Sequence, residues 1–312
     1  MFAVAGAVLS ILVGVTIAKP GDRRNMLALG CLIFFLPLSI VLHELAHAFT
    51  EVALGLRLFV VSYGLSGRVL YRRRFRDWTL EIRRSLSGGF ALAAPRSTRW
   101  LRLRWSLVVA AAPLANALLA AAAFVAAPKF PSIEGMLQSF AWANLILLVV
   151  SLFPWKYATP FGVSPSDGLA LLTISFASSK MLQKRHAAYF ALEGMDCLRM
   201  KDPEGAEAWA RKGLREYPGE VSNRSVLGVA LLALERLDEA RSLFLELAAS
   251  DEPLANEPQN KAIFLNNVAW ADLLTGDGNL LEEADQYSQQ AMRLTPWVAS
   301  IKGTRGSVLV LP

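Results

Sequence analysis

Cysteine and charged side chains are both scarce in this chain of 312 amino acids. The two cysteines, Cys31 and Cys197, are too few for a disulfide framework or for a zinc site made of cysteines. Charged residues make up 19% of the chain, against roughly 25% in an average soluble domain. Hydrophobic residues make up 54% and the mean hydropathy is +0.37, which argues against a disordered chain and against a purely soluble one.

Acidic residues are scarce in the first 180 positions, which hold 18 Lys or Arg and 7 Asp or Glu. Positions 181–312 hold 14 Lys or Arg and 19 Asp or Glu. The basic residues of the first part are mostly arginines, interleaved with Trp and Leu among apolar segments, which is typical of loops that flank a membrane. We therefore expect no nucleic acid as a partner. The change of charge near residue 180 predicts two domains, 1–180 and 181–312.

Four apolar segments approach the roughly 20 residues that a membrane-spanning helix needs. They cover residues 2–18, 26–56, 105–127 and 133–155. A signal peptide is the alternative interpretation of the first segment. No basic residue precedes its apolar run, however, and Lys19 and Pro20 stand where a small-residue cleavage site is expected. These features favour an uncleaved first helix.

An arginine-rich connection, residues 57–104, separates the second and third apolar segments and contains twelve arginines and two acids. Its basic excess predicts a cytoplasmic location, and four crossings would then place both chain ends on the same side. Residues 58–71 and 78–86 are rich in Val, Leu, Tyr and Trp. They predict a pair of strands that ends at Gly88 and Gly89.

His43, Glu44 and His47 form an H-E-x-x-H motif inside the second apolar segment. With 3.6 residues per turn, both imidazoles lie on one helix face and can bind one zinc ion, and the glutamate stands beside them to take a proton from water. A chance pair of core histidines is the alternative. Ionisable groups at the centre of a spanning helix cost on the order of 2.5 to 3.5 kcal/mol each, so three of them in little more than one turn favour a functional site.

Further motifs follow in a fixed order in the membrane half. They are Gly88-Gly89-Phe90, Ala112-Pro113-Leu114-Ala115-Asn116, and residues 151–154 followed by Asp167 and Gly168. Together with the H-E-x-x-H motif, this order resembles the site-2 protease family of intramembrane zinc metalloproteases over most of residues 26–177. The chain departs from the family pattern where Ala112 replaces Gly and Ser151 replaces Asn. Residues 155–166 also separate the proline from the aspartate by more than is usual in the family.

The resemblance implies one zinc ion held by His43, His47 and Asp167, with Glu44 as general base and then as proton donor to the leaving amine. A catalytic zinc has three protein ligands and one open position, and no other acid of the membrane half fits the third place as well as Asp167. Helix capping is the alternative role for this residue, because Ser166 and Asp167 directly precede an apolar run.

The implied substrate is a transmembrane protein whose spanning helix unwinds before cleavage. The strand region before Gly88 and Gly89 would hold it extended by strand addition, so both glycines are candidates for substrate contact. Asn116 and Asn144 are the remaining polar candidates in the spanning segments. They suit substrate contact and, equally, hydrogen bonds between helices that pack through small residues. Membrane lipid is a further expected partner.

A period of 34 residues follows the membrane half. The pairs at this spacing are Gly194 with Gly228 and Ala206 with Ala240. The spacing resembles the tetratricopeptide repeat, a helical hairpin that stacks into a solenoid and serves as a binding surface for a protein partner. Residues 266–296 predict a third unit. Gly306 starts a fourth one, which is either a capping helix or part of an incomplete unit.

These patterns predict an all-α polytopic membrane protein with about four spans and a short membrane-associated β-strand region, followed by an α-helical tetratricopeptide-repeat solenoid. The expected function is hydrolysis of peptide bonds in membrane-spanning proteins, with the cytoplasmic repeats recruiting or regulating partners. The alternative is a membrane-anchored repeat adaptor whose protease half has lost its activity. The intact Glu44 argues against the adaptor, whereas Ser151 and residues 155–166 argue for it.

Overall fold

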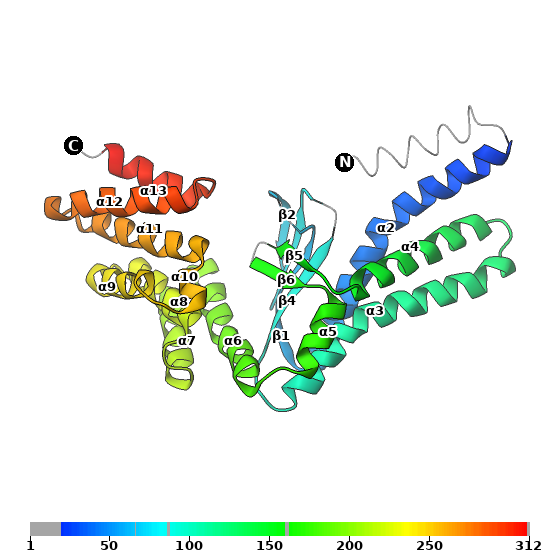
Figure 1. Ribbon diagram of the computed structural model, residues 1–312, viewed down its shortest axis with the longest axis horizontal. Coiled ribbons are helices and arrows are strands. Elements are labelled where there is room, and N and C mark those ends of the chain that lie inside the picture. Colours follow the sequence, from blue (N-terminus) through cyan, green and yellow to red (C-terminus); the bar gives the residue numbers. More distant parts are fainter. Residues whose placement is uncertain (1–19, 66, 86–87, 160–161, 311–312) are drawn as a thin grey trace. The chain divides into compact units, whose positions relative to one another are not determined.

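The computed structural model describes residues 20–65, 67–85, 88–159 and 162–310. The chain is mostly helical and divides into two compact units, residues 1–182 and 183–312. Figure 1 shows their helices and strands in chain colours. The predicted first span, residues 2–18, lies outside the described residues.

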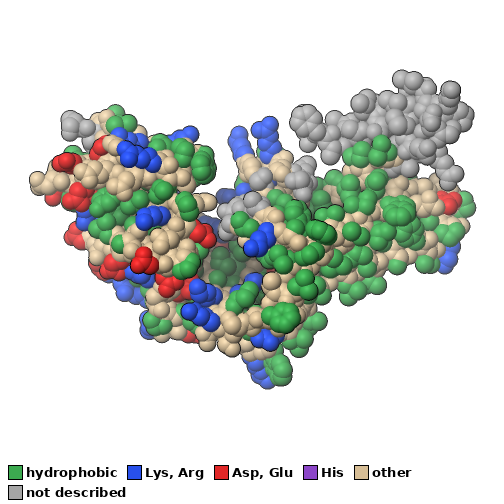
Figure 2. Space-filling view, in the orientation of Figure 1, with side chains coloured by type: hydrophobic (Ala, Val, Ile, Leu, Met, Phe, Trp, Pro, Cys, Tyr) green, Lys and Arg blue, Asp and Glu red, His purple; other side chains and the backbone are tan. Residues whose placement is uncertain are grey.

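Three helices of the first unit are long and apolar enough to cross a membrane: α2 (Pro20–Ala53), α3 (Leu101–Ala126) and α4 (Glu134–Leu152). Each of them packs against the other two. Large apolar side chains stay exposed along α3 and α4, among them Leu107, Leu114, Leu118, Trp142 and Val149. Figure 2 shows hydrophobic side chains gathered over this region. Such a surface suits helices that face lipid rather than water.

All three helices differ at their ends from the predicted segments; α4, for example, ends at Leu152 and not at Trp155. α2 ends at Ala53, before the predicted Leu56, because Gly55 adopts a left-handed φ of 73° that favours glycine and stops the helix. α3 begins at Leu101 instead of Trp105. The chain turns directly before it, where Trp100 has a φ of 53°.

A four-stranded sheet is formed by the arginine-rich connection between α2 and α3. Its strands are β1 (Leu56–Tyr63), β2 (Val69–Arg74), β3 (Thr79–Arg83) and β4 (Gly89–Pro95), in the order β2-β3-β1-β4. β1 runs parallel to β3 and antiparallel to β4, and β2 runs antiparallel to β3. The central β1 is buried along almost its whole length, whereas β2 is an exposed edge strand.

The prediction of a single strand pair in this region is wrong. Residues 58–71 contribute to two strands, because the chain turns at Gly64, whose φ of +104° is a conformation that favours glycine. Gly89, predicted to end the sheet, is the first residue of β4. Because β1 is buried on both faces, its sequence lacks the alternation of apolar and polar residues that indicates a strand. Its pairing with β4 joins residues that are far apart in the chain.

A short hairpin follows α4, within residues 155–166, which separate the proline of the motif from Asp167. Its strands β5 (Lys156–Thr159) and β6 (Gly162–Pro165) are antiparallel. Ser166 closes the base: its N–H donates to the carbonyl of Trp155 at 2.9 Å, and its Oγ accepts from the N–H of Trp155 at 3.2 Å. α5 (Asp167–Ser175) begins at the next residue. The hairpin therefore pairs its own backbone groups, as irregular backbone near a membrane requires.

The second unit consists of helices that pack in chain order. They are α6 (Ser179–Arg199), α7 (Pro203–Glu216), α8 (Val221–Ala233), α9 (Leu237–Ala248), α10 (Pro253–Asn256), α11 (Pro258–Thr275), α12 (Gly278–Leu294) and α13 (Ala299–Val310). α6 begins within the first unit. Gly306 lies inside α13 and does not start the fourth unit as predicted, since that helix already begins at Ala299.

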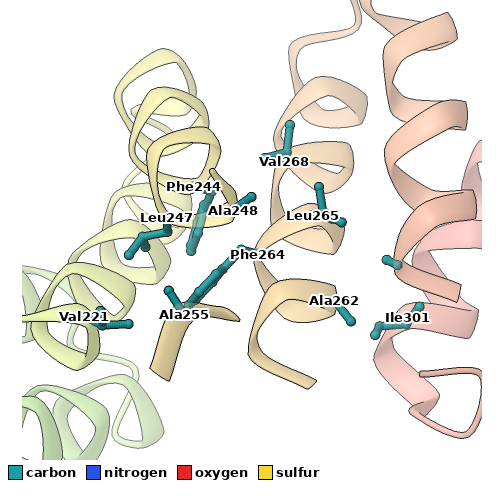
Figure 3. Packing of buried hydrophobic residues seen from close by; sticks show 11 residues of the cluster. Val221, Phe244, Leu247, Ala248, Ala255, Ala262, Phe264, Leu265, Val268 and Ile301 are labelled. Atoms are coloured by element: carbon teal, nitrogen blue, oxygen red, sulfur yellow. The ribbon is translucent and has the colours of Figure 1, made fainter. Parts of the chain in front are cut away.

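The glycines that recur after 34 residues lie where helices approach each other closely. A Cβ at Gly194 would lie 2.7 Å from Cγ1 of Val226, and one at Gly228 would lie 2.6 Å from the ring of Phe244. Figure 3 shows the buried cluster around Phe244, whose ring centroid lies 6.3 Å from that of Phe264. The period of the sequence therefore reflects a packing requirement between successive helices.

Candidate metal centre

The H-E-x-x-H motif lies in the second half of α2. His43 is 7% exposed and Glu44 is 9% exposed. The rings of His43 and His47 lie 4.9 Å apart and nearly perpendicular, at 89°. Ten residues separate His43 from the end of the helix at Ala53, which is about 15 Å along the helix axis. The motif is therefore deep in a helix that is long enough to cross a membrane.

Asp167, the first residue of α5, meets both histidines. Its Oδ2 lies 3.1 Å from Nε2 of His43, and its Oδ1 lies 3.3 Å from Nε2 of His47. The N-cap of α5 is Ser166, whose side chain accepts from the backbone N–H of Leu169 at 3.3 Å. Capping is thus performed by the serine, which leaves the aspartate carboxylate directed at the histidines.

Gly168 brings the start of α5 against the end of α4. A Cβ at this position would lie 1.8 Å from the carbonyl oxygen of Leu152 and 2.5 Å from its carbonyl carbon. Backbone atoms cannot yield as a flexible side chain does, so any residue larger than glycine would move α5. The Asp-Gly sequence therefore combines a candidate ligand with the residue that allows its helix to sit this close.

The Nδ1 atoms of both histidines are hydrogen-bonded to α3. His43 Nδ1 lies 2.6 Å from Oδ1 of Asn116, and His47 Nδ1 lies 2.9 Å from the carbonyl oxygen of Val108. A carbonyl oxygen only accepts, so Nδ1 of His47 carries the hydrogen. This partner also fixes the plane of the ring, as a hydrogen bond to the other ring nitrogen of a metal-binding histidine usually does.

A chain of amides fixes the hydrogen of His43 in the same way. The carbonyl of Phe140 accepts from Nδ2 of Asn144 at 2.9 Å, so Oδ1 of Asn144 points the other way and accepts from Nδ2 of Asn116 at 2.8 Å. Asn116 must then present its Oδ1 to His43, whose Nδ1 donates. Both asparagines are 0% exposed. The structure places them in hydrogen bonds within and between the helices, and their predicted contact with a substrate stays a prediction.

With its hydrogen on Nδ1, the imidazole of a neutral histidine carries a lone pair on Nε2. Two lone pairs therefore face the two oxygens of the Asp167 carboxylate, which is repulsive unless a cation or an added proton lies between them. The ligand atoms of His43, His47 and Asp167 all lie within 4.8 Å of one another. Atoms that bind one tetrahedral zinc ion at about 2.0–2.1 Å are roughly 3.3 Å apart. The donor set and its spacing fit a zinc ion.

Glu44 lies against the first residue of β4. A Cβ at Gly89 would lie 2.5 Å from Cγ of Glu44 and 2.7 Å from the carbonyl oxygen of Ser62. Gly89 therefore provides the space that the Glu44 side chain occupies, whether or not it also contacts a substrate. The Cβ of a residue at Gly88 would instead meet the side chain of Leu65, at 2.7 Å.

Two groups were not identified from the sequence, the carbonyl of Val108 and the side chain of Tyr157. The Val108 carbonyl is a backbone atom, so no pattern of residue types reveals it. Tyr157 lies in the hairpin of residues 155–166, which the sequence showed only as a departure from the family spacing. Burial raises the pKa of its phenol, and the charges of Glu44 and Asp167 raise it further. The longer spacing was the one signal that pointed to this residue.

No protein-family model, no curated protein and no solved structure matches this chain. The functional assignment therefore depends on the motifs and on the geometry of the site. What the structure defines is a mostly helical protein with three helices able to cross a membrane. Its first unit carries a cluster of two histidines and one aspartate, in which His43 is buried and the other two are half-buried, and a glutamate follows the first histidine in the chain.

Proposed function

We propose that this chain is an intramembrane zinc metalloendopeptidase of the site-2 protease type, which hydrolyses peptide bonds of membrane-spanning proteins. The convergence of His43, His47 and Asp167 carries the proposal. The three residues are brought together from two helices, and the two histidines belong to one that is long enough to span a membrane. Paired histidines and a carboxylate are a ligand set of catalytic zinc, and the resemblance of the motif order points to the same chemistry.

Each residue of the site has a separate task. His43, His47 and Asp167 would hold a zinc ion, which would act as a Lewis acid and lower the pKa of a water molecule to about 7. Glu44 accepts a proton from the attacking water and later donates it to the leaving nitrogen. Asn116 and Val108 hold the two rings with Nε2 toward the site. Gly89 keeps the space beside the Glu44 carboxylate open.

β4 supports a place for an extended substrate. It begins at Gly89 beside Glu44, and it pairs with β1 on one side, while its other side has no partner strand among the described residues. An extended peptide that adds to this edge would pass the catalytic glutamate. A helix supplies such a segment only where it unwinds, so helix-breaking residues in the substrate favour cleavage.

The second unit, in this proposal, is a tetratricopeptide-repeat solenoid that binds a protein partner on the cytoplasmic side. The 34-residue recurrence of glycines at close helix contacts supports this assignment, as does the order in which α7, α8, α9, α11 and α12 pack. The partner recruits substrate or restrains access to the site. Lipid contacts the exposed apolar faces of the three long helices.

Cleavage of a designed peptide tests this proposal. The probe is a quenched fluorescent peptide with one apolar helix of about 20 residues, the length of a membrane span, interrupted by Gly-Pro. The zinc-loaded full chain in detergent cleaves it, and Glu44→Gln lowers the rate by about 100-fold or more while zinc stays bound. Glu204→Gln, which changes an exposed glutamate of α7, leaves the rate unchanged. Equal rates in Glu44→Gln and the parent, or no cleavage by a zinc-loaded parent, would contradict the proposal and favour the adaptor.

A further inference from the structure

An open apolar groove lies at the start of α3 in the first unit. Its volume is about 480 Å³, which falls within the roughly 300–1,000 Å³ of sites that hold small ligands. The walls come from Trp100 and the first two turns of α3, from Ser175 at the end of α5 and from Leu182 of α6. Figure 1 shows α5 beside this part of α3, against which it packs.

The groove lies where a spanning helix begins. α3 is one of the three helices able to cross a membrane, and Leu101, its first residue, lines the groove and is 1% exposed. Trp100 and Leu103, which also line the groove, are 69% and 56% exposed. Exposed apolar side chains continue with Leu107 on α3 and Phe176 after α5. An exposed tryptophan at the end of a spanning helix is typical of the level of the lipid headgroups.

The segments that form the groove carry positive charge alone. Residues 96–106 contain four arginines and no acid, and residues 168–182 contain one lysine and no acid. No acidic residue lies in the first turn of α3. An apolar groove between such segments fits a ligand that joins an apolar chain to an anionic group.

Arg102 is the arginine that lines the groove. Its Nη2 donates to the carbonyl of Ala177 at 2.6 Å, which holds the guanidinium next to the end of α5. A guanidinium has five N–H donors, so others remain for an anion. Arg104 instead connects α3 to the end of α2, since its Nε donates to the carbonyl of Leu54 at 2.8 Å. Arg99 is exposed and directly precedes Trp100.

The two helices beside the groove also build the candidate metal centre. The carbonyl of Val108 in α3 accepts from His47, and α5 begins with Asp167. The same helices pack through a buried cluster that includes Val109 and Ile174. A ligand in the groove therefore contacts both helices that position the site.

We propose that this groove binds one anionic phospholipid, with an acyl chain along its apolar wall and the phosphate at Arg102, assisted by Arg99. The planar guanidinium matches the oxygens of a phosphate group. The arginine-rich connection before α3 is expected on the cytoplasmic side, where the leaflet contains the anionic lipids. The inference requires that α3 spans the membrane, and it does not depend on the proposed hydrolysis.

Competition between two lipids tests the inference on the delipidated full chain in detergent. The probes are phosphatidylglycerol and phosphatidylcholine with identical acyl chains, and native mass spectrometry measures how much of each stays bound. Arg102→Gln and Arg99→Gln remove charge at the groove, and Ser106→Phe places a ring in it. Arg76→Gln, between β2 and β3, is the matched control, because it removes the same charge from an exposed position elsewhere. Unfolding temperatures without lipid check that the variants fold.

The parent is expected to retain one phosphatidylglycerol per chain and to bind phosphatidylcholine more weakly. Arg102→Gln lowers the affinity for phosphatidylglycerol by about 5-fold, the usual contribution of one basic residue near anionic lipid, and Arg99→Gln lowers it in the same direction. Ser106→Phe weakens binding of both lipids, while Arg76→Gln binds as the parent does.

Inorganic phosphate distinguishes a lipid from a free anion as the occupant. Added in excess, it leaves the lipid bound if the acyl chain is held in the groove as proposed. Displacement of the lipid by inorganic phosphate would overturn the inference in favour of a site for free phosphate. Equal binding of the two lipids by the parent would overturn it as well. So would an unchanged preference in both Arg102→Gln and Arg99→Gln, or an equal loss in Arg76→Gln.

Discussion

Nδ1 of His43 lies 2.6 Å from Oδ1 of Asn116, a contact that connects α2 to α3 across 73 positions of the sequence. Because Asn116 is itself held by Asn144, and Asn144 by the carbonyl of Phe140, the hydrogen of the imidazole is fixed on Nδ1. Nε2 is then free to bind a cation. The three long helices thus cooperate in setting the state of one candidate ligand.

Removing this amide weakens metal binding. In Asn116→Ala the ring of His43 loses its partner. We expect zinc affinity to fall by about 10- to 100-fold, the usual effect of losing a hydrogen bond that orients a ligand histidine. Ser106→Ala, on the same helix, leaves the affinity unchanged, since its exposed hydroxyl donates to the carbonyl of Arg102 in that helix. Competition with a chelator of known affinity measures both. Equal affinities for Asn116→Ala and the parent would show that the amide does not orient His43.

Gly168→Ala displaces a candidate ligand without altering it. A methyl group would overlap the backbone of Leu152, so α5 shifts and the Asp167 carboxylate moves from the histidines. We expect loss of most bound zinc, measured by elemental analysis. Gly135→Ala is the control, because a Cβ there meets nothing within 4 Å. Full zinc occupancy in Gly168→Ala would contradict the role given to this glycine.

The two histidines were predictable from sequence because their relation is local: the spacing of i and i+4 on a helix suffices. The sequence left Asp167 open between ligand and cap, and the structure divides these roles between Asp167 and Ser166. For Asn116 and Asn144 the sequence left two alternatives open, contact with a substrate and hydrogen bonds between helices. Choosing between them requires knowing how α3 faces α4, which no local pattern encodes.

The sheet shows more clearly that local sequence patterns do not predict contacts between distant segments. The parallel pairing of β1 with β3, with Val60 opposite Thr79, brings together strands that are not connected by a simple turn. β4 is predicted poorly because Gly89 and the alanines after it have weak strand propensity, and packing against β1 decides their state. Gly89 was noticed as a motif, but its contact with Glu44 depends on this non-local packing.

The repeat glycines give a test of the second unit. Gly228→Ala places a methyl group against the ring of Phe244, so we expect a loss of about 1–3 kcal/mol in unfolding free energy. Gly303→Ala in α13 meets nothing within 4 Å and is expected to stabilise by about 0.5–1 kcal/mol, as alanine does in an open helix position. Urea unfolding of the full chain compares the two. A change in unfolding free energy of the same sign in both variants would contradict this account of the 34-residue period.

Acid weakens the contact of Glu207 in α7 with Arg236, the N-cap residue of α9. Burial alone would raise the pKa of Glu207, but hydrogen bonds from Arg211 and Arg236, at 2.8 and 2.6 Å, outweigh it and hold the pKa below the usual 4.5. A lowered folded-state pKa means that the stabilisation is complete above 4.5 and is lost as pH falls through the folded-state value.

Glu207→Gln removes this charge at every pH. We therefore expect the parent to exceed Glu207→Gln in urea midpoint at neutral pH, and the difference to shrink as pH falls below 4.5. Glu204→Gln, an exposed glutamate in the same helix, serves as control. A difference that stays constant down to strongly acid pH would show that Glu207 is not stabilised as a carboxylate.

The central claim is that His43, His47 and Asp167 hold one zinc ion for a reaction in which Glu44 moves the proton. Elemental analysis of detergent-purified parent, Glu44→Gln, His43→Ala and Asp167→Ala tests it most directly. The account predicts nearly one zinc per chain in the parent and in Glu44→Gln, and its loss in the other two variants. A parent that binds no zinc after reconstitution, or zinc binding that is indifferent to Asp167→Ala, would contradict it.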